Sequence, residues 1–479
     1  INIKLNNMEI SKIINNKEHE KILSTASNIG EQLNIPVYLV GGYIRDAFLN
    51  KDRVDIDIMV GNNVFEFSKI LSKKLNINTT VNFEKFQTSR IPHKECDIEI
   101  ANARTEFYDP NSRKPSKIIS ASIEDDLIRR DFTINAICMS LNKSNFGELI
   151  DPYQGLKDID KGIIQTPADP DKTFIDDPLR MLRAIRFAAQ LNFNIPEEIK
   201  KSIIKNRERI KIVSFERITA EIIKMLSSKK PSVAFYLLKE LSLLEFVFPE
   251  LDIMSGVEVI DNKSHKDVFI HTLEVVDNAA KLSEKMEIRF SALVHDIAKP
   301  PTKRFNKKKG WTFHGHEEIG RRMLYGVAKR MKLPNDLRDY LMILTKLHLR
   351  PIALAKKEIT DSAIRRVMFE AGEYIDDLMI LCRADITTKN PMKIKKYMKN
   401  FERVEELMSD VKTRDEMKAF KSPVDGYEIM KALNLTEGIK IGLIKNKIEE
   451  AILENIIDND YDQAYKYMMD IKDDILNKN

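Results

Sequence analysis

The chain has 479 residues, enough for about three domains of ordinary size. With 43% hydrophobic and 32% charged residues, 16 glycines and 17 prolines, it is not collagen-like, low-complexity or largely disordered. The formal charge of +5 permits a nucleic-acid partner without demanding one. Three widely spaced cysteines argue against a disulfide framework and favour a reducing compartment, so we expect a cytoplasmic protein. No run of 18 apolar residues occurs, so we expect no transmembrane helix and no membrane partner.

The first 150 residues alternate between strand-like and helix-like segments. Residues 37–40 form a short apolar run that ends in a glycine pair, and residues 54–60 place apolar side chains on one face and two aspartates on the other. A period of two predicts a half-buried strand, and residues 97–100 repeat it. The apolar stretch 134–141 predicts another strand, and 64–75 predicts a helix. These elements indicate a small mixed α/β domain.

After residue 151 the apolar period changes to that of an α-helix. The predicted helices include 178–191, 196–205, 214–227, 231–241, 266–285, 287–298 and 316–331. The fold class is therefore expected to be α+β, with a mixed head followed by a mostly all-α body. We expect four parts, which are a head (20–150), a helical region (151–255), a second helical domain (256–400) and a helical tail (401–479).

The glycine pair and the two aspartates form the first candidate site. Gly41 and Gly42 stand between a strand and a helix, where backbone N–H groups can approach an anion closely. Asp55 and Asp57 are two residues apart on a strand, a spacing suited to divalent metal ions. A steric need for glycine and a solvated edge strand would explain each feature alone. Together they would bind the phosphates and the Mg²⁺ of a nucleoside triphosphate, and Glu99 or Asp97 would add a third carboxylate.

Six motifs resemble, in the same order, those of the class II tRNA nucleotidyltransferase and bacterial poly(A) polymerase family. They are Leu39–Asp46 with Asp55 and Asp57, Ile98–Glu106, Asp125–Ala136, Asp151–Asp158, Asp176–Phe187 and Ser214–Glu221. The third contains the sequence RRDFTINA. The resemblance identifies residues 20–150 as a nucleotidyltransferase head and extends over about residues 36–226.

The resemblance implies transfer of a nucleotide from ATP or CTP to the 3′-hydroxyl of an RNA, expected to be tRNA, with release of pyrophosphate. Asp55 and Asp57 would be the catalytic residues that hold two Mg²⁺ ions. One ion would lower the pKa of the attacking hydroxyl and the other would neutralise the triphosphate. The residues that would bind the nucleotide include Gly41, Gly42, Arg45 and Arg130.

The helix that starts near Asp177 is the expected base-selecting element. An aspartate carboxylate accepts from the exocyclic amine of cytosine or adenine, and an arginine donates to the neighbouring ring acceptors. Uracil and guanine place a carbonyl where the amine stands, so Asp177 with Arg180 would reject them. Arg183 would reach phosphate or ribose. The structural explanation of Asp177 is a helix N-cap before Pro178.

Histidines and aspartates in the later helices form the second candidate site. The residues in question are His271, His295, Asp296, His316, His348 and Asp385. Their order resembles the HD superfamily of metal-dependent phosphohydrolases, so residues 256–400 are expected to be an HD-type helical domain. The resemblance implies that these six residues hold a second divalent metal. Whether this site hydrolyses a substrate, such as a phosphate at a damaged RNA end, stays open.

Basic segments add candidates for RNA contact. Six lysines and arginines between residues 200 and 211 suit phosphate contact with tRNA, although a solvated helix face explains each one equally well. Residues 303–309 are expected to form an exposed basic loop. Gly438–Ile444 precedes a helix and resembles a segment near the family's RNA-binding tail, although a plain turn is an equal explanation.

The leading hypothesis is addition of C, C and A to the 3′ end of tRNA, favoured by Asn135-Ala136 and the intact pair of Asp177 and Arg180. The nearest alternative is an A-adding enzyme or poly(A) polymerase. A second alternative is an HD-type phosphohydrolase with an inert head domain. A third, a non-catalytic RNA-binding protein, is disfavoured by the retained carboxylates.

Overall fold

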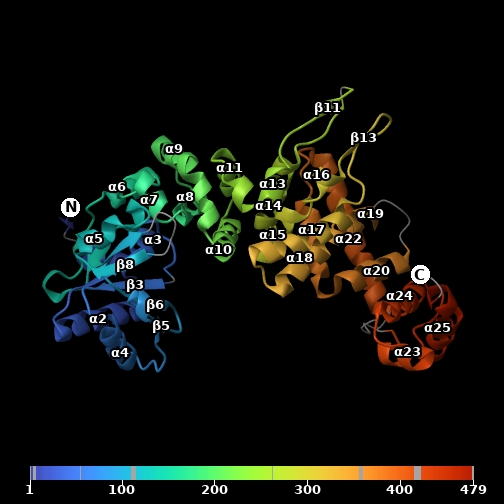
Figure 1. The fold of residues 1–479 in the computed structure, drawn as a ribbon, viewed down its shortest axis with the longest axis horizontal. Coiled ribbons are helices and arrows are strands. Elements are labelled where there is room, and N and C mark those ends of the chain that lie inside the picture. The colour runs from blue at the N-terminus through green and yellow to red at the C-terminus, as the bar shows by residue number, and fades with distance from the viewer. Residues whose placement is uncertain are drawn as a thin grey trace. The chain divides into compact units, whose positions relative to one another are not determined.

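The computed structural model describes residues 2–3, 7–53, 55–108, 115–261, 263–354, 360–414 and 422–476. The chain divides into two compact units, Ile1–Asp252 and Ile253–Asn479 (Figure 1). Within the described ranges, every helix is too short or too polar to cross a lipid bilayer.

The N-terminal unit is built on an eight-stranded sheet. Its strands, in spatial order, are β1 (Asn2–Ile3), β10 (Leu149–Ile150), β9 (Cys138–Ser140), β2 (Val37–Val40), β3 (Asp55–Val60), β6 (Asp97–Asn102), β5 (Thr88–Pro92) and β4 (Val81–Phe83). The pairing of β3 with β6 is parallel and the others are antiparallel. The alternation of residues 54–60 thus corresponds to a central strand, although Val54 lies outside the described residues. Strands β7 (Arg104–Tyr108) and β8 (Pro115–Ser120) form a separate antiparallel pair.

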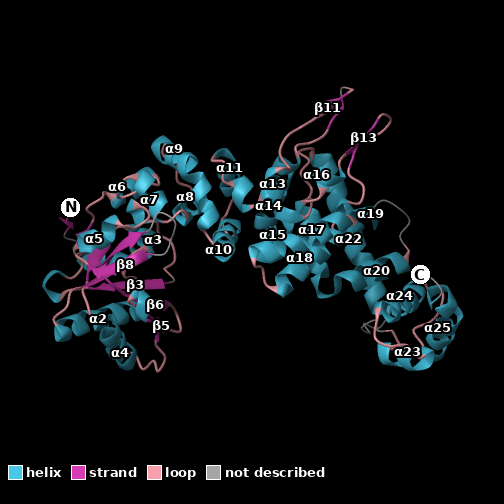
Figure 2. Cartoon of the chain, viewed as in Figure 1, coloured by secondary structure: helices cyan, strands magenta, loops and turns pink. Residues whose placement is uncertain are grey.

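One face of the sheet is covered by α2 (Lys17–Leu33) and α4 (Val64–Lys74), which pack side by side (Figure 2). Their apolar side chains recur at helical spacing and are fully buried, as Ile22 and Phe67 are. Helix α3 (Gly42–Phe48) follows the glycine turn of the candidate site, and α5 (Ile123–Ile128) precedes the segment that carries Arg130. Helix α4 confirms the prediction for 64–75 to within one residue.

The predicted strand at 134–141 is correct only in its second half. Residues Thr133–Asn135 form a 3-10 turn, and β9 begins at Cys138. The turn forms because the Asn135 side chain donates to Asp131 at 3.0 Å and accepts from Arg45 at 2.6 Å. These side-chain hydrogen bonds hold the backbone out of the sheet.

The remainder of the N-terminal unit is helical. Its helices are α6 (Gly155–Lys161), α7 (Pro170–Asp176), α8 (Leu179–Leu191), α9 (Glu197–Asn206), α10 (Phe215–Leu226), α11 (Ser232–Glu240), α12 (Leu244–Val247) and α13 (Pro249–Asp252). The four helices predicted from 178 to 241 agree with α8 to α11 within one residue at every end.

The C-terminal unit is mostly helical. Its helices are α14 (Val268–Leu282), α15 (Met286–Val294), α16 (Lys299–Thr302), α17 (His316–Met331), α18 (Asn335–Leu347), α19 (Arg350–Leu354), α20 (Asp361–Ala371), α21 (Ile375–Ala384), α22 (Pro391–Arg414), α23 (Gly426–Leu433), α24 (Ile439–Leu453) and α25 (Tyr461–Leu476). Two short hairpins accompany them, β11 (Val259–Ile260) with β12 (Lys263–Ser264) and β13 (Arg304–Asn306) with β14 (Gly310–Thr312).

The tail has a hydrophobic core of its own. Apolar side chains of α23, α24 and α25 pack together, with Ile429, Ile444 and Met468 fully buried. The expected boundary at residue 400 falls inside α22, and residues 415–421 between α22 and the tail lie outside the described residues. Gly438 is the N-cap of α24, as its place before a helix predicted.

Candidate functional site

The turn between β2 and α3 brings a glycine against an aspartate. Gly41 has a φ of 78°, and a Cβ added to it would lie 2.5 Å from Oδ2 of Asp57. Glycine is therefore required both for the backbone conformation and for the contact. In the sheet, Val40 lies opposite Asp57, and Asp57 lies beside Glu99. The strand register thus gathers two carboxylates at the glycine turn.

The carboxylates on the neighbouring strands β3 and β6 repel one another. Burial raises the pKa of Asp57 to about 6, Glu99 and Asp55 add to the rise, and Arg130 opposes it. Such a cluster gains from a divalent cation, and carboxylate oxygens are the ligands that Mg²⁺ prefers. These carboxylates are therefore of a type that binds Mg²⁺. Among the described residues, the groups of three possible metal ligands that lie close together are in the second unit, and none consists of carboxylates of the head.

One cavity of about 500 Å³ collects nearly all of the predicted head residues. The predicted residues that line it are Gly41, Gly42, Arg45, Asp57, Arg130, Asp177, Arg180 and Arg183. Asp55 lies outside this lining and is exposed at the first position of β3. Glu99 lines the cavity, whereas Asp97 forms an ion pair with Arg90. Arginines outnumber carboxylates eight to five among the lining residues, a balance that favours a polyanionic ligand.

Several of these arginines are held in place by other side chains. Arg45 is buried and donates to Asn135 at 2.6 Å and to Asp46 at 2.7 Å. Arg130 donates to the buried Asp126 at 3.1 Å. Burial opposes ionisation of Asp126, yet its arginine neighbours outweigh that effect and lower its pKa. The cavity wall is therefore a preorganised set of positive charges.

Asp177 lines the cavity and its side chain also supports the first turn of α8. Its Oδ1 accepts from the backbone N–H of Leu179 at 3.2 Å, which caps the first turn of α8. Its Oδ2 accepts from Arg217 of α10 at 3.2 Å. Arg180 lines the same cavity and donates to the backbone carbonyl of Arg129 at 2.6 Å. Arg217 stands in the motif Ser214–Glu221, but no local pattern there predicts its contact with Asp177.

Arg183 is tied to the loop that precedes β9. It donates to Oδ2 of Asp131 through Nε at 2.6 Å. Burial alone would raise the pKa of Asp131, but the charge of Arg183 and a hydrogen bond from Asn135 lower it to about 2. This ion pair between the half-buried Arg183 and the buried Asp131 joins α8 to the RRDFTINA segment and so fixes the cavity wall.

The basic stretch from 200 to 211 is largely engaged within the protein. Three of its lysines form ion pairs, which are Lys200–Glu240, Lys205–Asp171 and Lys211–Glu208. Arg207 and Arg209 donate to backbone carbonyls. These contacts favour the structural explanation of these residues over RNA contact.

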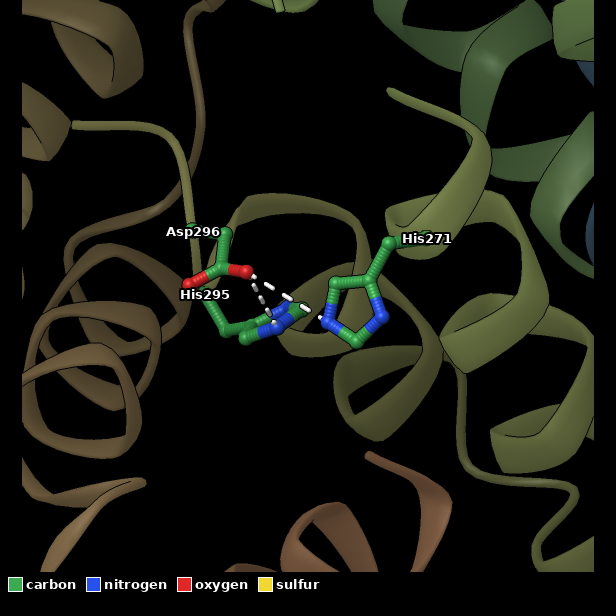
Figure 3. Close-up of side chains that lie close together, drawn as sticks. All are labelled: His271, His295 and Asp296. Atoms are coloured by element: carbon green, nitrogen blue, oxygen red, sulfur yellow. Dashed lines mark ion pairs between the residues drawn. The ribbon is translucent and has the colours of Figure 1, made fainter. Parts of the chain in front are cut away.

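The six residues of the second site come together in the C-terminal unit. His271 lies on α14, His295 and Asp296 follow α15, His316 begins α17, His348 follows α18 and Asp385 follows α21. Figure 3 shows the imidazoles of His271 and His295 close to the Asp296 carboxylate. We call these six residues the histidine–aspartate cluster.

Asp296 is the centre of the cluster. Its Oδ2 lies 3.2 Å from Nε2 of His295 and 3.5 Å from Nε2 of His271. Its Oδ1 lies 3.3 Å from Nε2 of His316. His271 Nε2 also lies 3.0 Å from Oδ1 of Asp385. Two groups of three possible ligands therefore share Asp296, each with its atoms within 4.8 Å of one another.

The histidines are oriented by their second ring nitrogen. The Nδ1 atoms of His295, His316 and His348 contact the backbone carbonyls of Ala292, Phe313 and Thr345 at 2.8, 2.8 and 2.7 Å. These contacts place the proton on Nδ1 and leave each Nε2 as a lone-pair donor. Burial lowers the pKa of His348 to about 4, so its imidazole is neutral, the form that binds metal.

Two buried atoms of the cluster, Nε2 of His295 and Oδ1 of Asp296, form no hydrogen bond of ordinary geometry, although they lie 3.2 Å from Asp296 Oδ2 and 3.3 Å from His316 Nε2. Unpaired polar atoms in an interior are costly and indicate a missing ligand. Nitrogen and carboxylate donors suit Zn²⁺, Mn²⁺ or Fe²⁺. The residues present therefore fit one or two divalent metal ions.

Three family models match the chain in succession. They are a Poly A polymerase head domain at residues 37–165, a probable RNA- and SrmB-binding site of polymerase A at residues 192–254, and an HD domain at residues 268–390. A multifunctional CCA protein from Shewanella frigidimarina is 32% identical over 370 residues, which cover 73% of this chain and 83% of the relative.

Solved structures share the fold at low identity. The CCA-adding enzyme of Bacillus stearothermophilus in complex with CTP is 22% identical, with a TM-score of 0.64 over 95% of this chain and 98% of that one. The Thermotoga maritima CCA-adding enzyme complexed with tRNA is 20% identical, with a TM-score of 0.58 over 98% of this chain and 99% of that one.

Proposed function

The chain belongs to the family of the multifunctional CCA proteins, and we propose that it adds C, C and A to the 3′ end of tRNA from CTP and ATP, with release of pyrophosphate. The observation that carries the proposal is the cavity in which the glycine turn, the carboxylates of Asp57 and Glu99, and the proposed base-selecting residues meet. The head-domain match at 37–165 supports the same reaction class.

In this proposal Asp55 and Asp57 hold Mg²⁺. When bound, the metal supplies charge neutralisation at the triphosphate and a lower pKa for the attacking 3′-hydroxyl. The chain's own contribution is positioning. Gly41 and Gly42 let the backbone approach the phosphates, while Arg45 and the other fixed arginines offer positive charge that does not need to reorganise. Arg130 adds a charge next to Asp57.

Base selection is assigned to Asp177 and Arg180. An incoming cytosine or adenine donates its exocyclic amine to the Asp177 carboxylate and accepts from Arg180. In the structure Arg217 holds Oδ2 of Asp177 at 3.2 Å while Leu179 holds Oδ1. We infer that Arg217 keeps the carboxylate oriented before the base arrives. Arg183 contacts phosphate or ribose.

The test is incorporation of single nucleotides. Purified protein is incubated with tRNA that lacks its 3′ end and with one labelled NTP at a time. CTP alone should extend this acceptor, and ATP alone should extend tRNA that already ends in CC. Incorporation of ATP with CTP ignored would contradict CCA addition and favour an A-adding enzyme or poly(A) polymerase.

A second activity is favoured by the unpaired atoms of the histidine–aspartate cluster. We propose that the cluster, as a metal site of the HD type, hydrolyses a phosphate ester at an RNA end. Water attacks the phosphorus, the bond to the RNA oxygen breaks, and orthophosphate and an RNA hydroxyl leave. His295→Ala should abolish phosphate release and metal binding by the cluster while nucleotide incorporation continues. Asp55→Ala should abolish nucleotide incorporation while phosphate release and metal binding by the cluster continue. If His295→Ala instead abolished incorporation, the separation of the two sites would fail.

A further inference from the structure

Two hairpins project beyond the helices of the C-terminal unit (Figure 1). We call residues 258–261, 263–265 and 303–313 the twin-hairpin arm. Strands β12 and β14 join the two hairpins, because Trp311 Nε1 donates to the carbonyl of Lys263 at 3.0 Å. Lys263 Nζ in turn donates to the carbonyl of Lys307 at 2.6 Å. The two hairpins are therefore one structural element.

Aromatic rings stiffen this arm. The ring of Trp311 meets those of His265 and Phe305 edge to face, at centroid distances of 5.3 and 5.2 Å. Lys303 Nζ lies 4.7 Å from the Trp311 centroid and 2.8 Å from a carboxylate oxygen of Glu258. The rings of Trp311 and Phe305 are half-buried, so each keeps an accessible part. Half-exposed rings beside cations are the usual platform for stacked bases.

The arm carries a strong local excess of positive charge. It has six lysines and arginines against two carboxylates, and one of the two, Glu258, is already paired with Lys303. Lys307, Lys308 and Lys309 are exposed at the tip. The tip is a defined turn, because Asn306 Oδ1 accepts from the backbone N–H groups of Lys308 and Lys309 at 2.9 and 3.0 Å. Such a row of cations fits the phosphates of a nucleic acid.

The base of the arm adjoins the histidine–aspartate cluster. Phe313 follows β14, and its carbonyl lies 2.8 Å from Nδ1 of His316. Lys299 Nζ lies 5.8 Å from the Phe313 ring and donates to Asp296. On the other hairpin, β12 leads into α14, which carries His271. Both hairpins therefore end at residues of the cluster.

We propose that the twin-hairpin arm binds the single-stranded 3′ end of an RNA and leads its terminal phosphate to Asp296 and the histidines. A fully extended chain of the six residues from Lys308 to Phe313 spans roughly 16 Å. Stacked nucleotides advance by about 3.4 Å, so the arm has room for about five of them. The inference rests on the hydrolytic function proposed for the cluster. It adds the surface that selects RNA over smaller phosphate esters.

The test compares two triple variants of the full chain. The arm variant carries Lys307→Gln, Lys308→Gln and Lys309→Gln. The control carries Lys69→Gln, Lys73→Gln and Lys74→Gln, which remove the same charge from exposed positions of α4 in the other unit. Trp311 is the only tryptophan of the chain, so its unchanged emission without RNA reports that the arm is still folded.

Binding is measured with a short single-stranded RNA that ends in a 3′-phosphate, over a range of salt concentrations. For single strands, each phosphate contact steepens the plot of log binding constant against log salt concentration by about 0.7. Loss of three lysines should therefore reduce the magnitude of this slope by about 2 in the arm variant. The control should keep the wild-type slope, and RNA should change Trp311 emission in both the wild type and the control. An unchanged slope in the arm variant, or no RNA binding by the wild type, overturns the proposal.

Hydrolysis gives the second measurement. The arm variant should show at least a tenfold lower kcat/KM on the 3′-phosphorylated RNA and the wild-type value on a nucleoside 3′-monophosphate. An equal loss on both substrates overturns the proposal, since the arm would then only support the cluster. If the wild type hydrolyses neither substrate, the hydrolytic function fails, and the salt slope still decides whether the arm binds RNA.

Discussion

Replacement of Asp57 by asparagine should stabilise the metal-free protein while it abolishes nucleotide addition. Burial beside Glu99 and Asp55 raises the pKa of Asp57 from 3.8 to about 6. A difference of about two units corresponds to about 3 kcal/mol, and because Asp57 is only partly buried, solvent screening reduces this to about 1–2 kcal/mol. Asp57→Asn keeps the shape of the side chain and removes this cost.

The sign of the pH dependence follows from the direction of the shift. Because the folded-state pKa of Asp57 lies above its unfolded value, both states are protonated below about pH 4 and the cost is absent there. As pH rises through 6 the folded state must ionise an unfavourable carboxylate, and the cost becomes complete. The advantage of Asp57→Asn in EDTA should therefore be full at pH 7.5 and vanish near pH 4. Mg²⁺ should stabilise the wild type and leave the variant unchanged.

The assay is urea unfolding in EDTA, with pulsed hydrogen–deuterium exchange of peptides from β2 and β3 as the readout for the N-terminal unit. Trp311 fluorescence reports the C-terminal unit, which should not change. Asp97→Asn is the matched control on β6, because Asp97 is paired with Arg90 at the surface and should shift stability by less than about 0.5 kcal/mol. Equal or lower stability of Asp57→Asn at pH 7.5 would refute the reasoning.

Three further predictions concern the pair of Asp177 and Arg180, the ion pair of Asp131 with Arg183, and the histidine–aspartate cluster. Asp177→Asn offers an amide that can donate to a carbonyl, so discrimination against UTP should fall by about 10- to 100-fold in single-nucleotide incorporation. Asp131→Asn should lower the free energy of unfolding by about 2–3 kcal/mol at pH 7, because the pKa of Asp131 is about 2. That difference should be present above about pH 4 and disappear as pH falls through 2, in urea titrations. Removal of metal by a chelator should lower the unfolding midpoint of the C-terminal unit, followed by Trp311 fluorescence, and His316→Ala should make that midpoint insensitive to the chelator.

The sequence by itself determined the features that depend on local pattern. The period-two alternation located β3, the period of 3.6 located α8 to α11, and the order of histidines and aspartates identified the cluster residues. Local patterns succeed here because strand and helix periods reflect which side chains a single segment must bury. The glycine pair after β2 belongs to the same class, whereas its place beside Asp57 depends on the pairing of β2 with β3.

Tertiary structure alone decided the contacts between residues far apart in the chain. Arg217 holds Asp177 although 40 residues separate them. Asn135 forms a turn where hydrophobicity predicted a strand, because Arg45, 90 residues away, bonds its side chain. The basic loop at 303–309 became part of an arm only because Lys263 and Trp311 join two hairpins. Such contacts follow from how helices and strands pack in space, and side-chain periodicity along one segment carries no information about which distant segment it will meet.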